Sequence, residues 1–126
     1  MSIKTEVVQV TDLRPWAKNA RTHSKKQLRQ IGESIRTFGF TNPVLIDGEN
    51  TILAGHGRVE AAKLIGMGAV PCVRLEHMTP EEKRAYVIAD NKLALNAGWD
   101  EDLLAEELKA LLDTEGLGFD LDVVGF

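Results

Sequence analysis

The chain has 126 residues, 44% of them hydrophobic and 27% charged, with a formal net charge of −4 at pH 7. This length and composition are typical of a single soluble globular domain. Its one cysteine, Cys72, excludes an internal disulfide, and no apolar run is long enough to span a membrane. The N-terminus also lacks the apolar core of a signal peptide, so we expect a cytoplasmic protein with no membrane partner.

Charge is distributed unevenly along the chain. Seven basic residues and one acid lie between positions 14 and 36, whereas nine acids and one lysine lie between positions 100 and 122. A basic stretch can follow a polyanion such as DNA, although such charges are also common on solvated helix faces. The candidate nucleic-acid contacts are Lys18, Lys25, Lys26 and Arg29.

The N-terminal part predicts a strand, a loop and a helix. Residues 6–10 alternate as in a strand, and Pro15 ends regular pairing at the start of a basic loop. Ser24 and Gln27 have the spacing of a capping box, which predicts a helix start. Apolar residues then recur at helical spacing as far as Gly39, a typical helix stop.

A hairpin and a glycine turn follow. Residues 44–46 and 51–54 read as two short strands, and residues 47–50 (DGEN), with the Asp-Gly pair, favour a hairpin turn between them. After the second strand come the turn Gly55-His56-Gly57 and then Arg58, followed by a helical pattern that stops at Gly66.

The glycine turn is a candidate site for an anion. A strand that feeds a turn and a helix leaves the first N–H groups of that helix unpaired, at the positive end of the helix dipole. Gly55 and Gly57 allow a close approach of the backbone to a ligand, and the fork of Arg58 suits two phosphate oxygens. Glycine is also common in turns that bind nothing, so a plain structural turn is the alternative.

The C-terminal half predicts one more strand and two helices. Residues 70–75 read as a strand, which Pro71 restricts to a sheet edge or places at the strand's beginning. Thr79 and Glu82 form a second capping box, and Gly98 ends that helix. Its expected buried side is Ala85, Ile88, Ala89 and Leu93.

The last helix is capped by Asp100, and residues 116–126 form a half-apolar tail that needs a surface to pack on. The resulting order of elements predicts a mixed α+β domain with a small mixed sheet and about four helices. We place the domain at residues 1–115 and treat residues 116–126 as a tail or the start of a linker.

Three motifs follow one another along the chain. The first comprises residues 19–24 (NARTHS), 34–36 (SIR) and 39–44 (GFTNPV). The second is residues 55–61 (GHGRVEA), and the third is residues 88–93 (IADNKL). Their types and order resemble the arginine loop, the GERR-type box and the glutamate–asparagine motif of the N-terminal domain of ParB partition proteins, in the wider ParB/sulfiredoxin superfamily.

The resemblance implies a bound nucleoside triphosphate, CTP with Mg2+ as in partition proteins or ATP as in other members. Carried over by position, the phosphate-binding residues would be Arg21, Gly55, His56, Gly57, Arg58 and Asn91. Asp90 stands where a glutamate assists the metal, and a carboxylate suits Mg2+. The stretches GHGR, ADNKLALNAGWD and GFDLDVVGF resemble ParB-like domains of phages and mobile elements that often precede a DNA methyltransferase. This resemblance would make the chain the N-terminal domain of a longer protein. A homodimer is a separate expectation.

Several residues depart from the family pattern. Sulfiredoxin needs a cysteine where Gly55 stands, so sulfinic acid reduction is excluded. Leu93 replaces an arginine of the third motif, which bears on CTP binding. The DNA-reading domain of partition proteins would follow this domain, so DNA contact falls to the basic loop and helix or to a further domain.

Two other functions stay open. Glu33 and Glu60 are expected on the pocket side of their helices and could serve as catalytic groups of a small phosphotransferase or nuclease, or the domain could hydrolyse a triphosphate slowly. Alternatively, the domain could tether protein or DNA and keep only a vestigial pocket. His23 is expected to be polar surface.

Overall fold

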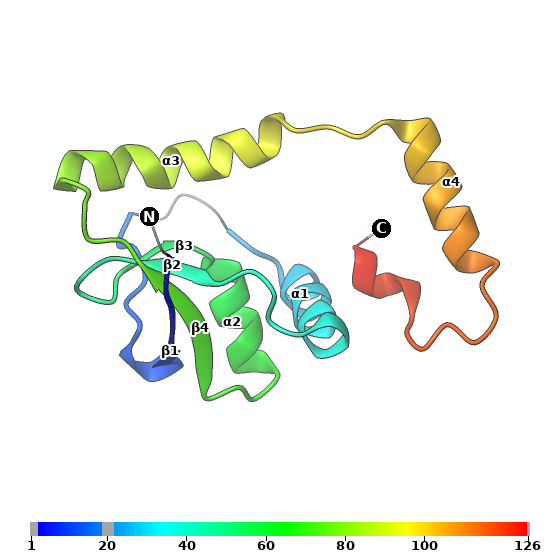
Figure 1. Cartoon of the computed structure of the whole chain (residues 1–126), viewed down its shortest axis with the longest axis horizontal. Coiled ribbons are helices and arrows are strands. Elements are labelled where there is room, and N and C mark those ends of the chain that lie inside the picture. The colour runs from blue at the N-terminus through cyan, green and yellow to red at the C-terminus, as the bar shows by residue number, and fades with distance from the viewer. Residues whose placement is uncertain (1–2, 19–21, 126) are drawn as a thin grey trace.

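The computed structural model describes residues 3–18 and 22–125 (Figure 1). Four strands form one mixed sheet in the order β1-β4-β2-β3. β1 pairs antiparallel with β4, β4 pairs parallel with β2, and β2 pairs antiparallel with β3. The strand bounds are Thr5–Gln9 for β1, Val44–Ile46 for β2, Ile52–Ala54 for β3 and Ala69–Arg74 for β4.

Helices connect and flank these strands, which confirms the predicted mixed α+β class. The helix bounds are Lys25–Phe38 for α1, His56–Leu64 for α2, Pro80–Asn96 for α3 and Glu101–Leu112 for α4, with short 3-10 helices η1 at Val10–Asp12 and η2 at Leu121–Val124. Each of these helices is too short or too polar to span a bilayer within the part of the chain that the structure describes.

The helix starts follow the predicted capping signals. Thr79 and Glu82 form a complete capping box at α3, and the Asp100 side chain accepts a hydrogen bond from the backbone of α4. At α1 only half of the box is present. Ser24 Oγ accepts from the Gln27 N–H, while the Gln27 side chain pairs with His23 instead of the Ser24 backbone.

The core lies between the sheet and α2. Val44, Ile46, Val70 and Cys72 are fully buried, and Val59 of α2 packs in the same cluster. α1 lies against α2 at Gly32, where a Cβ would come within 2.9 Å of Ile65 Cγ2. The glycine therefore permits close packing of α1 against the C-terminal part of α2.

β4 is an internal strand, so of the two predicted alternatives the edge strand is wrong, and Pro71 lies near the beginning of the strand instead. The parallel pairing with β2 involves only Cys72–Arg74, which follows Pro71. Because Pro71 precedes this pairing, its missing N–H does not interrupt the ladder with β2. Proline is thus tolerated here in an interior strand.

The predicted buried side of α3 is also wrong. Val87 is 5% exposed, whereas Ile88 is 69% and Leu93 is 67% exposed; Ala85 and Ala89 are exposed as well. Figure 1 shows why, since α3 runs across the sheet near β3 and then extends away from it, with α4 beyond. A helix that touches the body along one narrow line buries few residues, whatever its apolar content.

The C-terminal tail returns to the body and packs on α1 (Figure 1). The rings of Phe119 and Phe38 meet edge to face with centroids 5.5 Å apart. Val123 of η2 is 9% exposed. Apolar residues of the tail, Phe119 and Val123, thereby pack against the rest of the domain.

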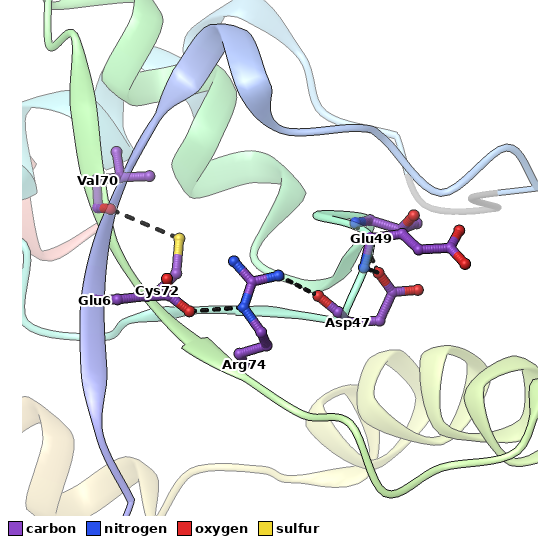
Figure 2. A network of polar contacts seen from close by, with 7 residues as sticks. Glu6, Asp47, Glu49, Val70, Cys72 and Arg74 are labelled. Atoms are coloured by element: carbon purple, nitrogen blue, oxygen red, sulfur yellow. Dashed lines mark hydrogen bonds and ion pairs between the residues drawn. The ribbon is translucent and has the colours of Figure 1, made fainter.

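A polar network fixes the β2–β3 hairpin to its neighbours (Figure 2). Asp47 is 4% exposed, and its Oδ1 accepts hydrogen bonds from the backbone N–H groups of Glu49 and Thr51. Its Oδ2 lies 3.1 Å from Lys83 Nζ on α3. Arg74 joins the network by donating to the Asp47 carbonyl and to the Glu6 carboxylate, both at 2.8 Å.

Burial acts to raise the pKa of Asp47, but the hydrogen bonds from Thr51 and Glu49 and the charge of Lys83 outweigh it, so the pKa lies below its usual value. We expect Asp47→Ala to lower the free energy of unfolding by about 2–4 kcal/mol, since it leaves two backbone donors and a lysine without their acceptor. The wild-type contribution should be complete above about pH 4 and should disappear as the pH falls through the lowered pKa. Urea denaturation at neutral and acidic pH measures both effects. A loss in Asp47→Ala no larger than in the exposed control Asp12→Ala would contradict the network's role.

Candidate functional site

A cavity of about 480 Å³ opens beside the start of α2. Its walls come from α1, the loop between α1 and β2, the end of β3, the first turn of α2, α3 and the C-terminal tail. Residues of all three sequence motifs therefore meet at one place. The site residues in its lining are Gly55, His56, Gly57, Arg58, Asp90 and Asn91.

Gly55 turns the chain from β3 into α2. It adopts a left-handed conformation with φ of 104°, and a Cβ at this position would lie 3.0 Å from Arg58 Nη2 and 3.4 Å from Val44 Cα. α2 begins at His56, inside the stretch predicted to be a turn, so Gly57 lies within the helix. The first intrahelical donor is the Val59 N–H, which bonds the Gly55 carbonyl; the N–H groups of residues 56–58 precede it and suit an anion.

His23 covers the first turn of α2. Its ring lies so close to Gly57 that a Cβ there would be 2.9 Å from the ring atoms, and Nδ1 lies 3.1 Å from Gln27 Oε1. The expectation of a surface residue was therefore wrong, because His23 lines the cavity. The position of His23 in the arginine-loop motif was the sequence signal that could have placed it at the cavity.

His56 ties the N-terminal loop to the site. Its Nε2 accepts a hydrogen bond of 2.9 Å from the Trp16 backbone N–H, which requires a neutral ring with its proton on Nδ1. Burial lowers the pKa of His56, and the charge of His23 lowers it further, against the opposing effect of Glu60. Nε2 therefore cannot donate a hydrogen bond to a phosphate, which is the role expected of His56.

Arg58 lies across the wall of the cavity. Its Nη2 donates to the Pro43 carbonyl at 3.1 Å, while its buried Nε has no hydrogen-bond partner among the described residues. Burial lowers the pKa of Arg58, and the negative charge of Asp90 opposes this effect. Nη2 of the guanidinium thus binds the protein backbone. The buried Nε is a donor for which a ligand oxygen would be a suitable acceptor.

Asp90 and Asn91 reach the cavity from α3. Asn91 Nδ2 donates to the Val87 carbonyl one turn earlier at 3.0 Å. Within residues 3–18 and 22–125, no three His, Cys, Asp or Glu side chains gather as a metal site would require. Asp90 brings a carboxylate to the cavity lining, a group of the kind that Mg2+ prefers as a ligand.

Other predicted residues lie elsewhere. Glu33 and Glu60 are exposed, pair with Arg36 and Lys63 on their own helices, and are not part of the cavity lining, contrary to expectation. Arg21 lies outside the described residues. The candidate nucleic-acid contacts Lys18, Lys25, Lys26 and Arg29 are all exposed.

The chain belongs to the ParB N-terminal domain family, whose pattern matches residues 2–92. It is 50% identical over 86 residues to the ParB-like nuclease domain-containing protein YnaK of Escherichia coli K12, covering 67% of this chain and 99% of that protein. It is 35% identical over 74 residues to the probable chromosome 2-partitioning protein ParB of Deinococcus radiodurans, covering 56% of this chain but 25% of that longer protein.

Solved structures show the same fold. ParB of Caulobacter crescentus complexed with CTP-gamma-S matches with a TM-score of 0.78 and 22% identity, over 97% of this chain and 71% of the other. The same partitioning protein complexed to the centromeric parS site matches with a TM-score of 0.54 and 22% identity, over 95% and 63%. Sulfiredoxin of Arabidopsis thaliana matches with a TM-score of 0.56 and 18% identity, over 67% and 97%.

Because folding lowers the pKa of His56, the unfolded chain takes up its proton first as the pH falls. The free energy of unfolding should therefore decrease as the pH drops below about 6.5, and the decrease should be smaller in His56→Gln. Chemical denaturation between about pH 8 and 5 measures the slope. The exposed His77 provides the control, since His77→Gln should keep the full decrease; equal slopes in His56→Gln and wild type would contradict the assignment.

Proposed function

We propose that this domain binds a nucleoside triphosphate, ATP or CTP, with Mg2+ in the cavity beside α2. The observation that carries the proposal is the convergence of unpaired N–H groups at the start of α2 with the buried, unpartnered Nε of Arg58. Both are donors, and both suit an anionic ligand. The family relationship supports the proposal, because a solved relative of the same fold is a complex with CTP-gamma-S.

Backbone groups of Gly55, His56 and Gly57 would hold the phosphates, together with the side chains of Arg58 and Asn91. Arg21, from the preceding loop, is a further predicted contact. Asp90 would hold one or more waters of the magnesium ion, since a single carboxylate with phosphate oxygens and water satisfies Mg2+. The ion would supply charge neutralisation of the phosphates.

Arg58→Ala should weaken binding of CTP or ATP in the presence of Mg2+ by about tenfold or more, because it removes a charge-assisted hydrogen bond in a buried site. Isothermal titration calorimetry measures the affinity. Asp90→Asn should mainly reduce the gain in affinity that Mg2+ gives, while binding without Mg2+ is kept or improved, because a negative charge near the phosphates is removed.

Arg36→Ala is the matched control for Arg58→Ala, since Arg36 is exposed and pairs with Glu33 away from the cavity. Arg58→Lys and a thermal unfolding curve separate weaker binding of the ligand from unfolding of the domain. Equal nucleotide affinity in folded Arg58→Ala and in wild type would show that the phosphates bind elsewhere.

The proposal includes an association with DNA transactions, as the partitioning names of relatives suggest. The exposed basic residues on the loop and α1 would contact DNA, directly or beside a further domain. The exposed apolar residues Ile88, Leu93 and Leu95 of α3 would support a homodimer. A cytoplasmic location, an origin in a phage or mobile element, and a linked DNA methyltransferase remain predictions.

Replacing Lys25, Lys26 and Arg29 together with glutamine should weaken binding to duplex DNA. It should also reduce the slope of log affinity against log salt by about 0.9 for each phosphate that the variant no longer neutralises. Fluorescence anisotropy at several salt concentrations measures both quantities. Lys109→Gln on exposed α4 should change neither, and an unchanged slope in the triple variant would remove α1 from the DNA-binding surface.

A further inference from the structure

The C-terminal tail forms one wall of the cavity. Val123, Val124 and Gly125 belong to its lining, although they lie more than sixty positions after the glycine turn in sequence. The edge-to-face contact of Phe119 with Phe38 attaches the tail to α1, and Figure 1 shows η2 beside that helix. The family pattern ends at residue 92, so this wall lies outside the matched region.

The part of the cavity formed by α1 and the tail differs chemically from the start of α2. Ile31 and Ile35 of α1 and Val123 and Val124 of the tail supply apolar surface there. Amide and hydroxyl groups lie among them, from Gln30, Ser34, Thr41 and Asn42. A nucleobase has apolar faces and polar edges, so such a mixture suits a base rather than a phosphate.

We propose that Val123 and Val124 form an apolar wall against which the base and sugar of the bound nucleotide pack. The inference rests on the proposed nucleotide function and adds the tail to the binding site. The bound ligand covers the tail's apolar side, and in return the tail removes apolar surface of the nucleotide from water. Nucleotide binding and docking of the tail therefore stabilise each other.

The test compares nucleotides with a ligand that has phosphates and no base. Isothermal titration calorimetry with CTP, ATP and inorganic triphosphate, each with Mg2+, should show that Val123→Ala and Phe119→Ala bind the nucleotide about fivefold to tenfold more weakly than wild type. Their affinity for inorganic triphosphate should be unchanged. Arg58→Ala should weaken both kinds of ligand.

Phe119→Ala weakens the attachment of the tail without replacing a residue of the cavity lining. Leu112→Ala is the matched control, because Leu112 is 70% exposed on α4, and it should keep wild-type affinities. Equal nucleotide affinity in both tail variants and wild type would overturn the inference while leaving the proposed function intact. So would an equal loss for nucleotide and triphosphate. Failure of wild type to bind any of the three ligands would overturn the proposed function and this inference with it.

Hydrogen exchange on the unaltered chain gives a test that needs no variant. Saturating nucleotide should slow exchange of the backbone amides of residues 119–125, whereas inorganic triphosphate should leave them unchanged. Protection limited to the start of α2, with no change in the tail, would overturn the inference.

Discussion

The left-handed turn at Gly55 is the constraint on which the site depends. A side chain there would meet both Arg58 and the backbone of β2, so only glycine lets β3 lead directly into α2 at this distance. The turn fixes two features together. It aims the first N–H groups of α2 at the cavity, and it lets Arg58 fold back onto the Pro43 carbonyl. A displaced turn would therefore disturb the helix start and the arginine at once.

The other half of the site depends on how α3 is attached. Lys83 holds the helix to the buried Asp47, and Val87 packs one turn later. Asp90 and Asn91 follow after another turn, on a helix that otherwise touches the body little. Because Asp47 also closes the β2–β3 hairpin through two backbone N–H groups, one carboxylate positions the strand before the glycine turn and the helix that faces it.

Local signals in the sequence predicted most of the elements but not their mutual contacts. Capping residues, apolar spacing and the Asp-Gly pair act within a few positions, so they placed the helices and the hairpin. The internal position of β4 depends on its pairing with β1 and β2, which come from distant parts of the chain. The presence of a proline in one strand does not reveal these partners, so the expectation of an edge strand failed. Likewise, α3 contacts the body through Lys83 and Val87 and not through the apolar residues that helical spacing had singled out. His23 against Gly57, and the tail in the cavity wall, also arise only from the tertiary fold.

In the glycine turn, the backbone N–H groups and the side chain of His56 have different roles. The backbone N–H groups at the start of α2 suit the ligand, and they would be present with almost any residue at position 56. The His56 side chain serves the scaffold by accepting a hydrogen bond from the Trp16 N–H, which attaches the chain at Trp16 to the start of α2. A substitution at position 56 would therefore alter how the chain is attached at Trp16 more than how a phosphate would be held. The preference for one nucleobase over another would then depend on the side of the cavity that α1 and the tail form, which lies outside the glycine turn in sequence.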